Sequence, residues 1–169
     1  MRFEKVVMSA FKQDLYRYGY LGLGFIEESY RNIVLPDRKT RFSAGYDFCT
    51  PIDFILKPGE KITIPTGIKC VFEEDEAEEW HLNLYIRSSI GIIRDVILCN
   101  NTGIIDPDYA GNPDNDGDIL IALRNVGDHV QQFRAGDRIM QGVLERHGIT
   151  ANDKAKGERK GGVGSTDQY

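Results

Sequence analysis

The sequence predicts an all-β domain of the jelly-roll or barrel type. From residue 33 onward, short runs of β-branched and other apolar residues alternate with Pro, Gly and Asp. The segments between these runs are too short for the helical crossovers that a parallel sheet requires. Many short strands joined by tight turns are typical of antiparallel sandwiches, jelly rolls and barrels.

The N-terminal part of the chain has a different texture. Residues 1–7 alternate weakly between apolar and polar side chains and favour a first strand. Residues 9–20 begin with a candidate N-cap, Ser9, and carry apolar residues at helical spacing, so we expect a short helix that ends at the following glycines. We therefore expect a short helical insertion over residues 8–30.

The expected strands follow in chain order: residues 52–56, residues 62–72 with a break at Pro65 and Gly67, and residues 82–86, 96–99, 119–123 and 138–144. Residues 73–79 hold six carboxylates and are expected to form a solvated connection. Residues 112–117 resemble the start of a calcium loop, but position twelve is Leu123, so we expect a solvated hairpin tip instead. The expected organisation is one domain over residues 1–149 and a flexible, glycine-rich lid over residues 150–169.

Composition excludes several classes of protein. A chain of 169 residues with 41% hydrophobic and 28% charged residues fits one globular domain. The net charge of −5 argues against nonspecific binding to nucleic acid. We find no apolar run of membrane-spanning length and no secretory signal pattern, so we expect a cytoplasmic protein without a membrane partner. The three cysteines are far apart and are expected to be free thiols.

Two segments carry candidate chemistry at strand ends. Arg87, Ser88 and Ser89 offer a guanidinium fork and two hydroxyls, which can grip a phosphate chain, although a plain surface turn remains open. Asp106 follows two isoleucines, where a strand opens into a turn, and a carboxylate there can orient and deprotonate a water. Tyr109 is expected to lie near it across the turn. The alternative is a hairpin with Asp and Pro in ordinary turn roles.

Two later segments could complete such a site. Gln141 alternates with Met140 and Gly142 and can face away from the core, or simply be an exposed strand residue. Residues 159–166 combine glycines, cations and hydroxyls, a composition that can close over an anionic ligand, or form a flexible terminus.

Taken in order, five motifs in this chain resemble those of the all-β, homotrimeric dUTPase family (dUTP diphosphatases). Each is weak or moderate alone, but five in the family's order at compatible spacing are specific. They are residues 44–48 (Ala-Gly-Tyr-Asp-Phe), 87–89 (Arg-Ser-Ser), 100–111, 136–141 (Gly-Asp-Arg-Ile-Met-Gln) and 159–166. The resemblance extends from about residue 33 to the C-terminus.

This resemblance implies Mg²⁺-dependent hydrolysis of dUTP to dUMP and pyrophosphate by a homotrimer whose subunits share active sites. Asp106 would activate the water that attacks the α-phosphorus. Tyr109 would pack on the deoxyribose and exclude a 2′-hydroxyl. Asp47 would hold a water on the Mg²⁺. The implied substrate-binding residues are Arg87, Ser88, Ser89, Asn100, Gly103, Ile105, Tyr109, Gln141, Arg159, Gly162, Val163, Ser165 and Thr166.

The chain departs from the family where an aromatic residue commonly stacks on uracil, because this position is Val163. We expect weaker dUTP binding as a result. Two alternatives remain at this point. A dCTP deaminase shares the fold but needs a Glu where this chain has Ala122. A catalytically weakened relative that acts as a binding or regulatory module would keep the fold without the turnover.

Overall fold

The computed structural model describes residues 1–20 and 23–162. Its strands are β1 (Arg2–Lys5), β2 (Tyr46–Cys49), β3 (Phe54–Leu56), β4 (Lys61–Pro65), β5 (Ile68–Val71), β6 (Trp80–Ile86), β7 (Val96–Leu98), β8 (Gly103–Ile105), β9 (Leu120–Asn125), β10 (Gln131–Phe133) and β11 (Arg138–Arg146). Its helical elements are α1 (Met8–Arg17), α2 (Leu23–Arg31), α3 (Glu74–Ala77), the π-helix η1 (Ser89–Ile93) and the 3₁₀ turn η2 (Pro107–Tyr109).

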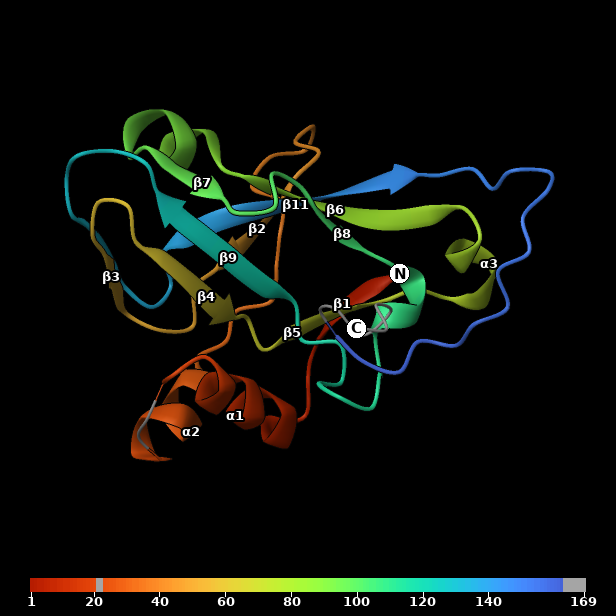
Figure 1. Ribbon diagram of the computed structural model, residues 1–169, viewed down its shortest axis with the longest axis horizontal. Helices are drawn as coiled ribbons and strands as arrows, with labels where there is room; N and C mark the ends of the chain where they lie inside the picture. The colour runs from red at the N-terminus through yellow and green to blue at the C-terminus, as the bar shows by residue number, and fades with distance from the viewer. Residues whose placement is uncertain (21–22, 163–169) are drawn as a thin grey trace.

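The described strands form four small antiparallel sheets, which confirms the predicted all-β class. The largest has the order β2-β11-β6-β8, and the next has the order β4-β9-β7. Strands β1 and β5 make a third sheet, and strands β3 and β10 make a fourth. Figure 1 shows the long strands β6 and β11 side by side, with β9 crossing in front of β11, as expected for packed layers of a jelly roll.

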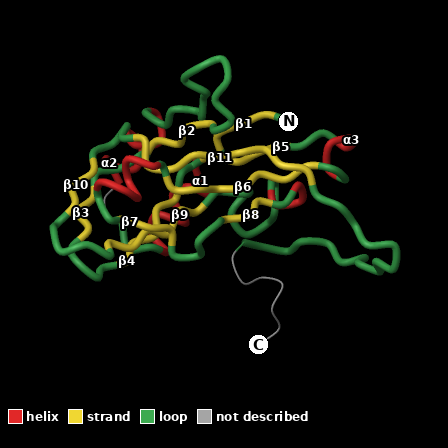
Figure 2. Tube along the Cα trace, turned by 90° about the horizontal axis from the view of Figure 1, so that it is seen from above, coloured by secondary structure: helices red, strands yellow, loops and turns green. Residues whose placement is uncertain are grey.

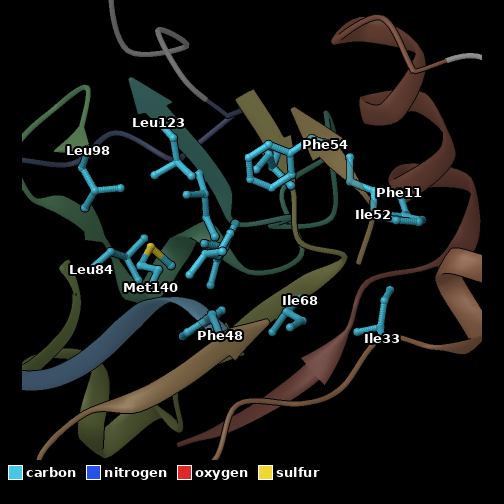
Figure 3. Packing of buried hydrophobic residues seen from close by; sticks show 14 of the residues in the cluster. Phe11, Ile33, Phe48, Ile52, Phe54, Ile68, Leu84, Leu98, Leu123 and Met140 are labelled. Atoms are coloured by element: carbon cyan, nitrogen blue, oxygen red, sulfur yellow. The ribbon is translucent and has the colours of Figure 1, made fainter. Parts of the chain in front are cut away.

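The core lies between the two larger sheets, where side chains from β2, β6, β9 and β11 meet (Figure 3). Phe48, Leu82, Leu123 and Met140 are buried there. Gly142 lets β11 lie against its neighbours, because a Cβ at this position would come within 2.9 Å of both Leu82 and Phe48. The close approach fixes the facing of β11 and leaves the preceding Gln141 on the outer side.

The N-terminal insertion is helical, as predicted, but it contains two helices rather than one. Helices α1 and α2 lie together on one side of the β domain (Figure 1). The first helix ends before Gly19, which has a φ of +88°. The sequence did not predict the second helix, because glycine lowers helix propensity. Tertiary packing outweighs that low propensity: Ile26 is buried, and Tyr30 donates a 2.6 Å hydrogen bond to the Val6 carbonyl.

Two connections also refine the predictions. The acidic segment is solvated as expected, but it forms the single helical turn α3, which Glu73 and Glu76 cap reciprocally. The prediction of a solvated hairpin tip over residues 112–117 is wrong, since Asn112 and Asn115 are buried. Their side-chain amides satisfy the backbone of the turn from within, so the polar loop can be buried without unpaired groups.

Within the described residues, no helix is long and apolar enough to cross a bilayer. The segment after β11 runs back along the molecule without regular structure and brings residues 159–162 beside η2 (Figure 2). Gly162, the last described residue, is buried there.

Candidate active site

The first half of the candidate site is a cavity of about 180 Å³ beside strand β8. Strand β8 pairs with β6 on one side and is at the edge of its sheet, so its outer backbone groups have no strand partner among the described residues. The cavity is lined by Leu84, Asn100, Gly103, Ile104, Ile105, Asp106, Tyr109, Leu120, Arg159 and Gly162. Seven of the expected substrate or catalytic residues therefore meet here.

Asp106 stands at the junction of β8 and η2. Its backbone is extended, Pro107 follows in the first position of η2, and its carbonyl accepts a 3.0 Å hydrogen bond from the Tyr109 amide. This turn points the carboxylate into the cavity with about half of its surface (49%) exposed. The predicted strand-to-turn position of Asp106, with Tyr109 nearby, is confirmed.

Arg159 reaches this carboxylate from the C-terminal segment. It forms an ion pair with Asp106, and its Nε lies 2.8 Å from the Asp108 carboxylate. The guanidinium also lies 5.6 Å from the centre of the Tyr109 ring. Desolvation is the largest single effect on the Arg159 guanidinium, and it lowers the pKa. The neighbouring carboxylates together raise the pKa by more, so the net shift is upward and the side chain stays charged.

Tyr109 is almost fully buried behind the cavity surface. Its hydroxyl donates a 2.9 Å hydrogen bond to the Asp118 carbonyl and accepts one of 3.2 Å from Asn115. Burial raises the pKa of Tyr109 to about 12, which keeps the phenol neutral and able to donate. One face of the ring is left toward Arg159 and the cavity.

The second half of the candidate site is a cavity of about 410 Å³ at the other end of β6. Its lining is rich in cations and hydroxyls, as phosphate binding requires. The lining residues are Lys39, Ser43, Gly45, Asp47, Arg87, Ser88, Ser89, Arg138 and Gln141. Five of the expected residues, Arg87, Ser88, Ser89, Gln141 and Asp47, therefore meet here.

Strand register explains why these residues converge. Gln141 on β11 pairs with Asp47 on β2 and with Tyr85 on β6, and Arg87 follows directly after the end of β6. Gly45 makes room for the glutamine, because a Cβ there would lie 2.3 Å from the Gln141 Oε1 atom. Gln141 thus lies in the cavity, beside a core-facing Met140, as its alternation predicted.

Asp47 lies between two arginines at this cavity. One carboxylate oxygen is 2.9 Å from Arg87 Nε, and the other is 3.0 Å from Arg138 Nη1. Sequence reasoning assigned no role to Arg138 or Lys39, although both lie in or beside recognised motifs. The signals in the sequence were their positive charge and their positions, Arg138 within the 136–141 motif and Lys39 a few residues before the 44–48 motif.

The two halves are separate within one chain. Ile105 lies opposite Leu82 on β6, so Asp106 is level with the start of that strand, whereas Arg87 follows its end. At about 3.3 Å per residue, the Asp106 and Arg87 positions are about 20 Å apart along the strand. Val163, Ser165 and Thr166 lie outside the described residues, so the expected tail contacts reach only as far as Gly162.

Comparison with known proteins places the chain among enzymes of one kind. The family model for dUTPase matches residues 31–166. A relative from Lactococcus lactis, a deoxyuridine 5′-triphosphate nucleotidohydrolase, is 38% identical over 141 residues, covering 81% of this chain and 91% of its own. One from Wolinella succinogenes, of the same name, is 30% identical, covering 80% of this chain and 87% of its own.

Solved structures agree with this grouping. The dUTPase of Streptococcus mutans aligns with a TM-score of 0.68 and 28% identity, covering 90% of this chain and all of the other. A dUTPase from phage phi11 of S. aureus, whose structure details a structural Mg(II) ion, aligns with a TM-score of 0.60 over 75% of this chain and 92% of its own, and at 20% identity it supports the fold alone. The matched span, the two curated relatives and the fold agree with the five motifs, and the chain belongs to the dUTPase family.

Proposed function

We propose that this chain hydrolyses dUTP to dUMP and pyrophosphate at active sites that form between neighbouring copies of the chain. One observation carries the proposal: the two cavities are chemically complementary halves, one suited to a nucleoside and the other to a triphosphate. Asp106 in the first and Arg87 in the second are about 20 Å apart along β6 in one chain. A substrate that needs both must take them from different copies. The family's activity is dUTP hydrolysis, which such a composite site would perform.

The nucleoside half offers uncharged groups for recognition of the base and the sugar. The free edge of β8 and the amide of Asn100 present backbone and side-chain donors and acceptors for the edge of a uracil base. The buried Tyr109 ring supplies a flat apolar wall for the sugar. A ribose would bring its 2′-hydroxyl against this wall, so the half-site favours a deoxynucleotide.

Asp106 is the residue suited to activate water. Its carboxylate is half-exposed in the cavity, so a water can reach it. In the proposed step, this water loses a proton to Asp106 while its oxygen bonds the α-phosphorus, and the bond from that phosphorus to the bridging oxygen breaks. Pyrophosphate leaves with the electron pair of that bond.

The phosphate half stabilises the charge of the triphosphate. Arg87, Arg138 and Lys39 supply cations, and Ser88 and Ser89 supply hydroxyl donors. Arg159 adds a guanidinium next to Asp106. We propose that a phosphate oxygen of the substrate takes over one of its N–H groups, which frees the carboxylate for water.

Mg²⁺ fits this chemistry as a substrate-bound ion rather than one held in a protein cage. The described residues contain no cluster of three or more metal-ligating side chains. Magnesium commonly keeps several waters and uses one carboxylate plus substrate phosphates. Each Asp47 oxygen contacts one arginine and keeps a second lone pair that can accept a hydrogen from such a water. When bound, the ion would supply charge neutralisation on the phosphates.

We further propose that the assembly is a homotrimer, as the family resemblance implies. Several large apolar side chains are strongly exposed in the single chain, including Ile92 (80%), Ile93 (77%) and Ile104 (63%). Exposed apolar residues of this size commonly mark an interface. Ile104 lies on β8, so an interface there would bring a neighbouring copy next to the nucleoside half.

The direct test is pyrophosphate release by the purified protein from dUTP, dCTP, dTTP and UTP, each with Mg²⁺ and with EDTA. We expect turnover of dUTP alone, dUMP as the second product, and a large loss of rate with EDTA. Ammonia release from dCTP would identify a deaminase instead. Absence of any turnover with dUTP would favour the binding module.

A further inference from the structure

A buried polar network behind Tyr109 connects both insertions of this chain to the nucleoside cavity. Asp14 comes from α1, and Asn115 comes from the loop over residues 112–117. Both side chains are buried, with 0% and 1% exposure. Asn115 Nδ2 lies 3.1 Å from Asp14 Oδ2 and 3.2 Å from the Tyr109 hydroxyl.

The directions of these hydrogen bonds are fixed. The Asn115 Oδ1 atom accepts from Asn112 Nδ2 at 2.9 Å and from the Gly117 amide at 3.1 Å, so the Asn115 amide cannot flip. Its N–H hydrogens therefore face Asp14 on one side, and on the other the Tyr109 hydroxyl and the Asp118 carbonyl, each 3.2 Å from Nδ2. That hydroxyl uses its own hydrogen on the Asp118 carbonyl and can only accept from Asn115.

Helix α1 is tied to the same loop by charge. Arg17 lies 3.1 Å from Asp14 and makes two contacts, of 2.7 and 3.0 Å, with the Asp114 carboxylate. The Asp114 carboxylate also accepts a hydrogen bond from the backbone amide of Gly162, in the C-terminal segment. Helix, loop and tail are thus linked through Asp114, beside the Asn115 side chain that contacts the Tyr109 hydroxyl.

We propose that Asp14 and Asn115 are positioning residues for sugar discrimination. Asp14 holds the Asn115 amide, the amide holds the Tyr109 hydroxyl, and the fixed hydroxyl keeps the ring forward against the sugar. Without Asn115 the hydroxyl keeps only the Asp118 carbonyl as partner, so the ring is held less firmly against the sugar and a 2′-hydroxyl is admitted more readily. The inference rests on the proposed function, since it assigns a specificity role at the same site.

The critical comparison is Asp14→Leu against Asp14→Asn. Both variants remove the charge that faces Arg17, but only Asn keeps an oxygen that accepts from Asn115. Arg17 is partly exposed and keeps Asp114 as its partner, so the leucine leaves no buried unpaired charge and folding is expected to persist. We expect Asp14→Leu to reduce the ratio of kcat/KM for dUTP to that for UTP about tenfold, mainly through KM, a size set by one buried hydrogen bond. We expect Asp14→Asn to retain the ratio.

A double-mutant cycle locates the effect. Tyr109→Phe removes only the hydroxyl, and we expect it to lower the same ratio. The double variant with Asp14→Leu should then be no worse than Tyr109→Phe alone, because both act through one tether. Asp116→Asn is the matched loop control: it weakens the ion pair with Lys69 but does not contact Tyr109, so it should leave the ratio unchanged.

Several results would overturn the inference: a ratio within twofold of wild type for Asp14→Leu, an equal loss for Asp14→Asn, or losses that multiply in the double variant. If Asp14→Leu does not fold, Asn115→Asp replaces it, since it keeps the Oδ1 acceptor and loses both N–H donors.

Fluorine NMR of protein labelled with 3-fluorotyrosine reports the contact between Asn115 and the Tyr109 hydroxyl without turnover. The Tyr109 signal should shift in Asp14→Leu and not in Asp14→Asn. If the wild-type protein fails to hydrolyse dUTP, the proposed function is wrong. An unshifted Tyr109 signal in Asp14→Leu would separately refute the positioning role of Asp14.

Discussion

Mixing two inactive variants tests whether neighbouring copies share each active site. Arg87→Ala damages the phosphate half, and Asp106→Asn damages the nucleoside half. These positions are about 20 Å apart along β6, so no single chain can join them in one site. In an oligomer formed from equal amounts of both variants, a site can combine the intact phosphate half of one variant with the intact nucleoside half of the other.

The size of the recovery follows from random assembly. Each site draws its phosphate half from one copy and its nucleoside half from a neighbour. Each of these halves is intact with a probability of about one half, so about a quarter of the sites are fully intact. An unselected mixture should therefore recover about a quarter of wild-type activity, and hybrid trimers purified free of both parents about a third. Each variant alone should retain far less, because each removes a group that stabilises the transition state.

The assay needs true exchange of subunits. The variants should be co-expressed with two different affinity tags, purified through both, and assayed for pyrophosphate release from dUTP. Arg87→Ala mixed with Gln141→Ala is the matched control, since both residues line the same cavity and no hybrid site regains both. Activity of the doubly purified Arg87/Asp106 hybrid that equals the mean of its two parents would refute a shared site.

Three further predictions concern single positions. Asp106→Asn should lower kcat by about 10²- to 10⁴-fold, with dUTP binding retained and a melting temperature close to wild type, because an ion pair this exposed contributes little stability; near-normal kcat would remove Asp106 as water activator. Val163→Phe should lower the KM for dUTP by restoring a stacking partner, and an unchanged or higher KM would contradict this. Burial, followed by the nearby Asp14 carboxylate, raises the pKa of Asp118 well above its usual 3.8, so the folded state holds a proton that the unfolded state releases. The resulting stability is complete below about pH 3.8 and is lost as pH rises toward the folded-state pKa; chemical denaturation across pH should show a flatter profile for Asp118→Asn, and equal slopes would contradict the assignment.

The separation of the two half-sites changes how the motifs should be interpreted. Arg87, Ser88, Gln141 and Asp47 meet because β2, β11 and β6 pair in register. Asp106 and Tyr109 meet because a short strand opens into one 3₁₀ turn. One chain builds each group, the first by strand pairing and the second by a single turn, and only an assembly would bring the two groups together.

The sequence alone determined the elements whose causes are local. Alternating short strands, the turn at Asp106 and the outward face of Gln141 follow from periodicity and from the residues that end strands. The ordered motifs pointed to the family, and the matched relatives agree. These features depend on a few neighbouring residues, so one chain read in order is enough to find them.

Only the tertiary structure decided the features that depend on distant contacts. Helix α2 forms in spite of its glycine because Ile26 is buried against other elements, and the polar loop over residues 112–117 is buried because Asn112 and Asn115 satisfy it from within. The contact between Asp14 and Asn115 joins residues about a hundred positions apart, a pairing that no local pattern encodes. Local physics fixes which groups a segment offers, whereas packing decides which of those groups meet.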